Sequence, residues 1–337
     1  MINKMDSIKK VVVTGGAGFI GSNMADFLLK KGIKVKIIDN FSSGKMKFIE
    51  HNLKNENYEY VKADLEDAEA LKKEFKGDYD FVFHFAANAD VKGGKENHGV
   101  DLKENVIATH NVLEAMRANG IKRIAFSSTG SVYGEPEVFP TPENAPFPLQ
   151  TSLYGASKLG CEGFIEAYCE THDFQAWIFR FVSIMGERYT HGVVFSFFQK
   201  LSKQKSENKI LPFLSDGTPL KSYLYIGDCI EAIWATINNS NDKINLFNLG
   251  TEEEIRVKEI ADIIVEGLGL KGKVKYAPSD KKRGWIGDSP HILLDISRIK
   301  KLGWKPKLTI KESILRTLNY IRENEWILNE QYFRKKN

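Results

Sequence analysis

The sequence contains few cysteines, and none of them is spaced for a metal site. Cys161, Cys169 and Cys229 are the three among 337 residues, and they lack the close C-x-x-C spacing of zinc and redox sites. The seven histidines show no ligand spacing either. We therefore expect reduced, buried thiols and no bound metal. Long apolar runs are also missing, since no segment approaches the roughly 18 residues that cross a bilayer, and we expect a soluble cytoplasmic protein with no membrane partner.

An excess of one charge is absent as well. Lysine and arginine number 48, and aspartate and glutamate number 44, which leaves a formal net charge of +4 with both signs scattered along the chain. A protein that binds nucleic acid needs a basic patch or stripe that this pattern does not provide. The basic run Lys281-Lys282-Arg283 is typical of a solvated surface. Nucleic acid is therefore not expected as a partner.

The first half of the chain alternates short β-branched segments with amphipathic stretches, which is the pattern of βαβ units around a parallel sheet. A length of 337 residues predicts one larger and one smaller domain. We expect an α/β protein in which residues 1–182 form a doubly wound (Rossmann) domain, joined by a strand that returns near 244–249. Residues 183–337 would form mainly a smaller C-terminal α/β substrate lobe. The expected strands lie near 10–14, 34–39, 58–61, 80–85, 123–127 and 175–179, and the expected helices near 19–31, 101–118, 154–172, 192–203 and 257–268.

A glycine-rich turn follows the first expected strand. The segment from position 14 to 21 reads Thr-Gly-Gly-Ala-Gly-Phe-Ile-Gly and has the spacing of a nucleotide-binding turn. Glycines let the backbone approach a pyrophosphate, and the start of the next helix offers N–H groups and a partial positive charge. A plain glycine-rich turn would explain the motif alone, but the strand before it and the acid that ends the next strand favour nucleotide binding. The candidate cofactor residues here are Gly15, Gly18, Phe19, Ile20 and Gly21.

The acid that ends the second strand is Asp39, about twenty residues past the glycines. A carboxylate there accepts hydrogen bonds from the adenosine ribose hydroxyls and repels a 2′-phosphate, and Asn40 adds no compensating positive charge. The cofactor is therefore expected to be NAD and not NADP. Asp64 and Leu65, after the third strand, are candidates for contact with the adenine ring, although a helix N-cap would explain Asp64 equally well.

Tyr154 and Lys158 place a phenol and an ammonium four residues apart on one helix face. An enzyme that oxidises an alcohol needs a base for the hydroxyl proton, and a free tyrosine, with a pKa of about 10, is too weakly ionised. A lysine cation and a positive nicotinamide ring together could supply the roughly 4 kcal/mol that lowers this pKa by about three units. The spacing alone is common and favours an aromatic above a surface lysine. The strand that ends in Ser127, Ser128 and Thr129 supports the catalytic interpretation, because a hydroxyl there can orient a substrate alcohol.

In this order, the motifs resemble those of the extended short-chain dehydrogenase/reductase family, in its NAD-dependent nucleotide-sugar epimerase and dehydratase branch, which includes the UDP-glucose 4-epimerases. The resemblance covers nearly the whole chain. It rests on TGGAGFIG at 14–21, Asp39, HFAA at 84–87, SSTGSVYG at 127–134, YGASK at 154–158, YLYIGD at 223–228 and KKLGWKPK at 300–307.

The resemblance implies a role for each residue of the catalytic group. Tyr154 would be the base, and Lys158 would be its partner and the anchor of the cofactor ribose. Thr129 would be the hydroxyl that orients the substrate. Ser128 and Ser127 are the next candidates for that role, with Ser127 also on the cofactor side.

Other positions match the cofactor and substrate contacts of the family. Phe85, Ala86 and Ala87 would line the cofactor. Asn105 stands where the family places a cofactor-side asparagine, and a helix-surface role explains it equally well. For the substrate diphosphate, Lys221 stands where relatives usually carry arginine, and Arg283 resembles the diphosphate arginine of the family. Ser183 replaces an asparagine that touches substrate in many relatives, so the sugar and base stay open among UDP- and TDP-linked hexoses.

The two positions after Thr129 separate the reactions of this branch. Sugar 4,6-dehydratases carry Asp-Glu there and decarboxylases also place a glutamate in this segment, whereas this chain has Gly130 and Ser131, which do not titrate usefully. The resemblance therefore implies an NAD-dependent 4-epimerase, which oxidises C4 to a ketone, turns the 4-keto sugar and returns hydride to its other face. A 4,6-dehydratase or another C4-oxidising enzyme stays an alternative. So does a redox-inactive NAD-binding sensor or scaffold, although such relatives tend to lose the catalytic residues that are intact here.

The family usually forms a homodimer through a helix bundle. The helices expected near 101–118 and 154–172 carry apolar residues on more than one face, which is consistent with such an interface. Packing of both helices on the sheet is the alternative explanation. The residues concerned include Ile107, Leu113, Met116, Phe164, Ile165 and Tyr168.

Overall fold

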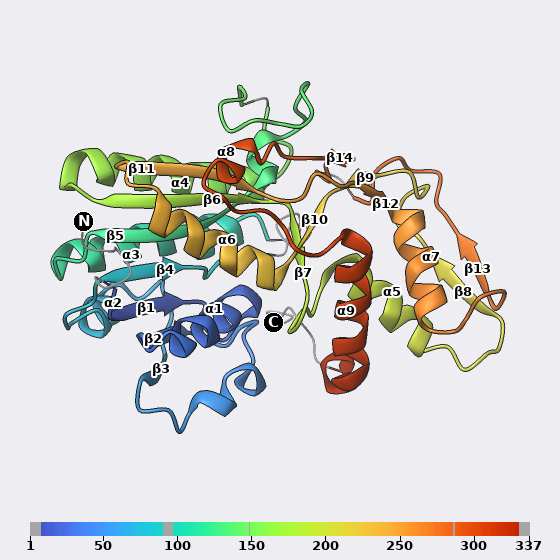
Figure 1. Ribbon diagram of the computed structural model, residues 1–337, viewed down its shortest axis with the longest axis horizontal. Coiled ribbons are helices and arrows are strands. Elements are labelled where there is room, and N and C mark those ends of the chain that lie inside the picture. Colours follow the sequence, from blue (N-terminus) through green and yellow to red (C-terminus); the bar gives the residue numbers. More distant parts are fainter. Residues whose placement is uncertain (1–7, 90–96, 148, 286, 330–337) are drawn as a thin grey trace.

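Seven parallel strands form the centre of the molecule (Figure 1). The computed structural model describes residues 8–89, 97–147, 149–285 and 287–329. Its main sheet has the order β11-β6-β5-β4-β1-β2-β3, with every neighbouring pair parallel, so the predicted doubly wound α/β sheet is confirmed. The chain order reverses between β1 and β4, where a crevice opens at the carboxyl ends of the strands. The strands are β1 (Lys10–Thr14), β2 (Lys34–Asp39), β3 (Tyr58–Lys62), β4 (Phe81–His84), β5 (Arg123–Thr129), β6 (Gln175–Phe181) and β11 (Ile244–Leu249).

Helices cover both faces of this sheet (Figure 1). They are α1 (Phe19–Lys30) and α6 (Ile226–Asn239) on one face, and α2 (Ala68–Glu74), α3 (Ala108–Ala118) and α4 (Leu153–His172) on the other. Side chains alternate along a strand, so Val11 and Val13 of β1 face α1 and α6, whereas Val12 faces α3 and α4. All three valines are fully buried. This double burial explains why β1 is a continuous apolar run and not an alternating one.

The second half of the chain builds a smaller lobe beside the carboxyl ends of the strands, which we call the C-terminal lobe (residues 183–329 without α6, β11 and α8; its helices α5 and α7 lie on the right in Figure 1). Its helices α5, α7 and α9 pack on one another. Phe197 and Phe213 stack in its core with ring centroids 5.3 Å apart. The elements of this lobe are β7 (Ser183–Met185), α5 (Gly192–Ser202), β8 (Lys209–Pro212), β9 (Leu220–Lys221), β10 (Tyr223–Tyr225), β12 (Ile255–Arg256), α7 (Val257–Gly267), β13 (Val274–Ala277), β14 (His291–Ile292), α9 (Ile310–Glu323) and η7 (Glu325–Asn329). The short helix α8 (Ser297–Lys300) packs on β11 of the main sheet.

The expected helix near 101–118 is not uniform. Its first part is a π-helix, η5 (Leu102–Ile107), and the α-helix α3 begins only at Ala108. A π-helical turn holds one more residue than an α-helical turn, and such turns are frequent at functional sites. Here the wider turn accompanies an asparagine, Asn105, whose side chain is buried and not exposed. The described residues of the first half also form the short 3₁₀ turns η2 (Met46–Phe48), η3 (Glu50–Asn52) and η6 (Gly130–Tyr133).

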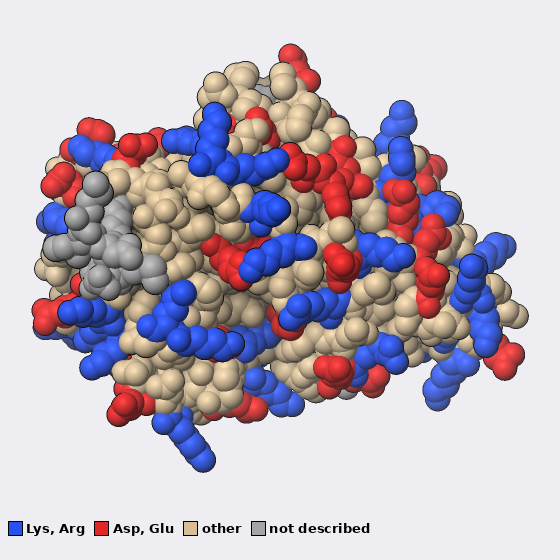
Figure 2. Space-filling model, viewed as in Figure 1, with Lys and Arg blue, Asp and Glu red and all other residues tan. Residues whose placement is uncertain are grey.

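Charged residues of both signs are interspersed over the face of the molecule shown in Figure 2. Among the described helices, none combines the length and the apolar character that a membrane-spanning segment needs. The three cysteines are free and buried, as the sequence predicted. In the described part of the chain, no three His, Cys, Asp or Glu residues come together in a way that could hold a metal ion.

His84, at the end of β4, is a buried link between three elements. Its Nδ1 lies 2.7 Å from the Thr14 hydroxyl, and its Nε2 lies 3.0 Å from the Thr109 hydroxyl. Because Thr109 donates its own hydrogen to Cys161, it accepts one from Nε2, and Nδ1 accepts from Thr14. Burial, together with the nearby charge of Lys158, lowers the pKa of His84 to about 3. The imidazole is therefore neutral in the folded protein.

Folding stability is expected to decrease on acidification because His84 resists protonation. In the unfolded chain this histidine takes up a proton at a pKa of about 6.5. The free energy of unfolding is therefore at its full value above that pH and decreases as the pH falls from about 6.5 towards 3. The decrease is at most about 1.4 kcal/mol per pH unit. Urea unfolding of wild type and His84→Gln between about pH 7.5 and 5 measures the effect, and the variant should lose less stability. The control His98→Gln changes an exposed histidine and should keep the wild-type slope. Equal slopes in wild type and His84→Gln would contradict the prediction.

Candidate active site

A cavity of about 560 Å³ lies at the carboxyl ends of β1, β2, β4, β5 and β6, between the main sheet and the C-terminal lobe. Its volume is that of a small-molecule site. The cavity collects nearly all of the residues that the sequence singled out. Those that line it are Gly15, Gly18, Phe19, Ile20, Gly21, Asp39, Asn40, Asp64, Leu65, Phe85, Ala86, Ala87, Ser127, Ser128, Thr129, Tyr154, Lys158, Ser183 and Lys221.

The glycine turn brings backbone to the cavity wall at a distance that no side chain would permit. Gly15 has φ +68°, and a Cβ atom there would lie 2.7 Å from the backbone of Ala86. A Cβ atom at Gly21 would lie 2.2 Å from the carbonyl oxygen of Gly15. Helix α1 starts directly after this turn, with Gly18 as its N-cap and no acidic residue in its first turn. The N-terminus of the helix therefore offers its N–H groups and partial positive charge to an anion, and the turn fits a dinucleotide pyrophosphate.

Asp39 ends β2 with both carboxylate oxygens held by the backbone. Oδ2 accepts a hydrogen bond from the N–H of Ala17 at 3.0 Å, and Oδ1 accepts one from Phe41 at 2.7 Å. Burial raises the pKa of Asp39, and these two hydrogen bonds oppose that rise. Each carboxylate oxygen has a second lone pair, so the fixed carboxylate retains the capacity to accept ribose hydroxyls.

Asn40 and Asp64 form the neighbouring part of the wall. The Asn40 side-chain amide donates to Asp64 at 3.1 Å. The N-cap of α2 is Asp67 and not Asp64, so the alternative explanation of Asp64 as a helix N-cap was wrong. The side chain of Asp64 instead accepts from the N–H of Glu66 at 3.0 Å.

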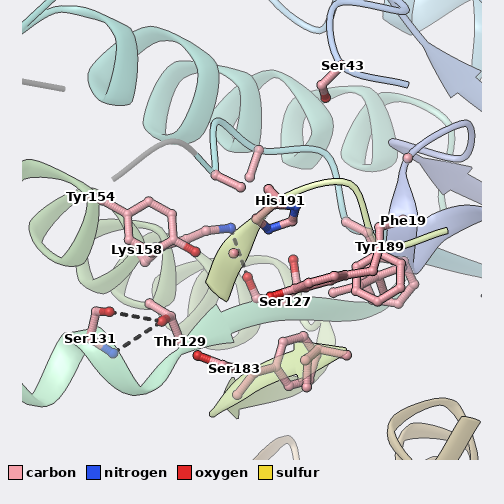
Figure 3. A pocket seen from close by; sticks show the side chains of 18 of the residues that line it. Phe19, Ser43, Ser127, Thr129, Ser131, Tyr154, Lys158, Ser183, Tyr189 and His191 are labelled. Atoms are coloured by element: carbon pink, nitrogen blue, oxygen red, sulfur yellow. Dashed lines mark hydrogen bonds between the residues drawn. The ribbon is translucent and has the colours of Figure 1, made fainter. Parts of the chain in front are cut away.

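Tyr154 and Lys158 project from α4 towards the end of β5 (Figure 3). The Lys158 ammonium donates to the carbonyl oxygen of Ser127 at 2.8 Å and lies 4.6 Å from the centroid of the Phe126 ring. Burial lowers the pKa of Lys158 to about 8, although nearby acidic groups, Glu162 among them, oppose this shift. The lysine therefore keeps most of its charge at neutral pH.

Burial also shifts the phenol of Tyr154 towards its neutral form. Burial raises its pKa to about 12, and a hydrogen bond with Thr129 opposes the rise only in part. The sequence predicts a lowering by Lys158 and a positive nicotinamide ring acting together, and this stays a prediction, whereas the desolvation of the phenolate by itself raises the pKa. Tyr154 holds its proton at neutral pH until further positive charge enters the cavity.

Thr129 is the hydroxyl that the end of β5 presents beside Tyr154 (Figure 3). Its Oγ1 accepts a hydrogen bond from the N–H of Ser131 at 3.1 Å and lies 3.2 Å from the Ser131 hydroxyl. Ser128 lies on the cavity wall but donates its hydroxyl hydrogen to Glu162. Of the neighbouring hydroxyls, Thr129 is thus the one that opposes the rise of the Tyr154 pKa.

Asn105 lies behind the wall and not on it. It is only 2 % exposed, so the alternative of a helix-surface role was wrong. Its side chain accepts from the N–H of Asn88 at 2.8 Å and donates to the Ser157 hydroxyl at 2.8 Å. Ser157 in turn donates to the carbonyl oxygen of Tyr154 at 2.8 Å. Asn105 therefore supports the first turns of α4 from behind.

The two cations expected at a diphosphate are both paired with acids. Lys221 lines the cavity and contacts Asp288 at 2.5 Å, and its ammonium lies 5.3 Å from the centroid of the Trp285 ring. Arg283 lies outside the lining and pairs with Glu135 at 2.7 Å. Of the two cations, Lys221 therefore lies on the cavity wall, whereas Arg283 lies outside it beside Glu135.

Sequence reasoning missed part of the wall. Tyr189 and His191 line the cavity; their place at the start of the C-terminal lobe left contact with a ligand and a role in shaping a loop as the two explanations, and the loop role was favoured. Their rings stack at 5.4 Å, and Tyr189 meets Phe19 edge-on at 5.7 Å (Figure 3). Trp285 and Asp288 belong to the same group. All four lie in loops, where no periodic pattern indicates which side chains face inwards.

The glycine turn, the acid after β2 and the Tyr-Lys pair thus share one cavity in a doubly wound sheet. A sequence profile described as GDP-mannose 4,6 dehydratase matches residues 12–317. The chain belongs to the NAD-dependent nucleotide-sugar epimerase/dehydratase family. Its members are similar to this chain over nearly its full length.

Three relatives illustrate the range of reactions in this family. The UDP-glucose 4-epimerase of Mycolicibacterium smegmatis is 30 % identical over 93 % of this chain and 98 % of its own length. The crystal structure of the Thermotoga maritima UDP-glucose 4-epimerase with UDP-glucose matches with a TM-score of 0.83 and 30 % identity, over 94 % of this chain and 99 % of that one. A double mutant of the dTDP-glucose 4,6-dehydratase of Streptomyces venezuelae, solved with NAD bound, matches with a TM-score of 0.84 and 25 % identity, over 94 % and 98 %. Overall similarity therefore identifies the family but not the reaction.

A methyl group at Gly21 is expected to destroy the nucleotide turn. In Gly21→Ala the new Cβ would lie 2.2 Å from a backbone oxygen, so the turn must move, and we expect a loss of about 1–3 kcal/mol of stability with at least a tenfold loss of NAD retention. Gly163→Ala is the matched control, since nothing lies within 4 Å of a Cβ there in the middle of α4, and it should gain about 0.5–1 kcal/mol. Thermal unfolding and the NAD released on denaturation measure both effects. Wild-type NAD retention in Gly21→Ala would contradict the assignment of the glycine turn to cofactor binding.

Proposed function

We propose that this protein is an NAD-dependent nucleotide-sugar 4-epimerase. The observation that carries the proposal is the meeting of Tyr154 with Thr129 at the cavity, next to Lys158 and followed by two residues without ionisable side chains, Gly130 and Ser131. This set can remove and return one proton at one hydroxyl. Elimination of water needs a further acid and base, which positions 130 and 131 do not provide.

In this proposal one part of the chain binds the cofactor and the other mainly binds the substrate. Residues up to 182, with β11, hold the cofactor through the glycine turn and Asp39. Residues from 183 onwards mainly hold the nucleotide sugar. NAD, when bound, takes a hydride from C4 of the sugar, returns it to the opposite face, and adds positive charge to the cavity.

Tyr154 removes the proton from the C4 hydroxyl, and Thr129 orients that hydroxyl towards it. Lowering the Tyr154 pKa from about 12 to near 7 corresponds to about 7 kcal/mol. The Lys158 charge supplies part of this, because its own pKa of about 8 leaves it protonated at neutral pH. The same tyrosine gives the proton back when the 4-keto sugar is reduced. Rotation of the keto sugar between these steps inverts the configuration at C4.

The substrate in this proposal is a UDP- or TDP-linked hexose. Lys221 would contact the diphosphate, since it is the lysine of the C-terminal lobe that the sequence assigned to this role and that lines the cavity. Ser183 would contact the sugar with a hydroxyl in place of an amide. The Thermotoga maritima relative, solved with UDP-glucose, supports this class of substrate.

Replacement of Tyr154 by phenylalanine is expected to lower kcat for C4 interconversion by at least about 10²-fold, because it removes the only hydroxyl that can take the C4 proton in this mechanism. UDP- and TDP-linked glucose and galactose are the substrates to assay, with product analysis by mass spectrometry and chromatography. The control is Tyr168→Phe on the same helix, where the phenol donates to Glu114 at 2.6 Å, and its kcat should change less than about twofold.

The outcome of this assay separates the alternatives. A 4-keto-6-deoxy product from wild type would replace the epimerase by a 4,6-dehydratase. A wild type that retains NAD but converts no sugar nucleotide in a broad panel would favour the sensor or scaffold.

We also propose a homodimer through η5, α3 and α4. Leu113, Met116 and Ile165 are fully buried against the sheet, so they belong to the packing that the alternative explanation described. Leu102 and Ile107 of η5 and Phe164 of α4 are 56 %, 42 % and 43 % exposed. These three side chains give the two helices an apolar outer face that a partner would cover.

Phe164→Glu is expected to convert the dimer to a monomer, because a charge would be buried at the interface. Light scattering after size exclusion at micromolar concentration measures the mass. Ile210→Glu, at an exposed position of β8 in the C-terminal lobe, should leave the dimer intact. A monomeric mass for the wild-type protein would contradict the proposed homodimer.

A further inference from the structure

A buried ion pair connects the helix of the catalytic residues to the two strands that end at the cavity. Arg180 of β6 meets Glu162 of α4 through two hydrogen bonds, from Nε to Oε1 at 3.0 Å and from Nη2 to Oε2 at 2.6 Å. Their side chains are 3 % and 2 % exposed. Ser128 of β5 donates its hydroxyl hydrogen to the same Oε1. One carboxylate thus holds groups from α4, β5 and β6 together.

The surroundings of Arg180 hold its guanidinium in place. Nη1 donates to the Tyr133 hydroxyl at 2.8 Å and to the carbonyl oxygen of Glu143 at 3.0 Å. The rings of Tyr133 and Phe147 lie 4.8 and 4.9 Å from the guanidinium carbon. Burial lowers the pKa of Arg180, but the hydrogen bonds and charge attraction of Glu162 and Tyr133 together outweigh it, and the pKa is raised. A forked pair of this kind fixes orientation as well as distance.

Glu162 lies on the same face of α4 as the two catalytic residues. Tyr154, Lys158 and Glu162 are four residues apart in turn, and each step advances about 6 Å along the helix axis. Glu162 therefore fixes the helix about 12 Å behind Tyr154. A slide or rotation of α4 at Glu162 would move the Tyr154 hydroxyl by a similar amount.

The two strand residues of the cluster stand next to substrate-side residues. Thr129 follows Ser128 directly, and Ser183 follows Arg180 by three residues. Because β5 and β6 pair in parallel, with Ser128 opposite Arg180, their ends move together. The carboxylate of Glu162 thus sets the position of α4 relative to both strand ends at once.

A buried ion pair contributes little net stability, because the cost of removing two charges from water offsets their attraction. Replacement of such a pair by apolar residues is often neutral or stabilising. Two apolar residues would not reproduce the fixed geometry that the two hydrogen bonds between Arg180 and Glu162 provide. We propose that Glu162 is a positioning residue, which through Arg180 and Ser128 sets the distance between the Tyr154 and Thr129 hydroxyls. This rests on the proposed function, in which both hydroxyls act on one sugar carbon.

Glu162→Gln tests the proposal with an isosteric change. A misplacement near 1 Å can cost about 10²-fold in rate, so we expect kcat for C4 interconversion to fall on the order of 10- to 100-fold. KM for the nucleotide sugar should change less than about threefold, and NAD retention should stay at the wild-type level, because the cofactor residues lie elsewhere. Glu166→Gln, one helical turn further along α4, is the matched control and should keep kcat within about twofold. A wild-type kcat in folded Glu162→Gln overturns the proposal.

A double variant separates positioning from stability. Glu162→Met with Arg180→Met removes both charges, and we expect its melting temperature to equal or exceed that of Glu162→Gln, while kcat stays at least tenfold below wild type. Recovery of wild-type kcat together with stability would show that the pair has only a structural role. This variant also keeps the test decisive if Glu162→Gln fails to fold.

A readout without turnover distinguishes failure of this proposal from failure of the proposed function. Hydrogen–deuterium exchange of the NAD-loaded protein should be faster at residues 153–160 in Glu162→Gln than in Glu166→Gln. If wild type converts no sugar nucleotide but this difference is present, the proposed function fails and the positioning of α4 by Glu162 stands. Equal exchange in the two variants overturns the positioning.

Discussion

The carboxyl ends of the parallel strands lie along one edge of the sheet, and the candidate site depends on that edge. Parallel neighbours require a crossover between strands, so residues far apart in sequence arrive at the same edge: the glycine turn after β1, Asp39 at the end of β2, and Thr129 at the end of β5. The valines buried on both faces of β1 hold the strands in register with the helices on either side. The reversal of strand order between β1 and β4 then leaves room for a ligand.

Residues whose roles depend on local geometry could be identified from the sequence. The glycine turn is such a case, because its need for glycine arises within eight residues, from contacts of Gly21 with Gly15. Tyr154 and Lys158 are another, because one helical turn relates them. The pairing of Lys221 with Asp288 spans 67 residues, and that of Arg283 with Glu135 spans 148. No periodicity connects residues at such separations, so these contacts became visible only in the folded chain.

The inward orientation of the Asn105 side chain could not be predicted for a related reason. Helical periodicity places residues at 3.6 per turn, whereas η5 is a π-helix. The asparagine side chain bonds to backbone near β4 and to a serine of α4, and these tertiary bonds override the local preference for a regular helix. A cofactor-side position and a helix-surface position were the two alternatives from sequence, and burial behind the cavity wall is a third.

Burial also decides the electrostatics of the site. It raises the pKa of Tyr154 to about 12 and lowers that of Lys158 to about 8, so both groups are shifted towards their neutral forms. The sequence-based figure starts from a solvated tyrosine, and it therefore understates the free energy by which the Tyr154 phenolate must be stabilised. Hydrogen-bond donors decide the role of Lys221 in the proposed function. Its ammonium has three N–H donors, and Asp288, itself fixed by the N–H of Gly284 at 3.2 Å, accepts one of them. Two donors are left for phosphate oxygens, so Asp288 can orient the lysine without having to leave when a diphosphate binds.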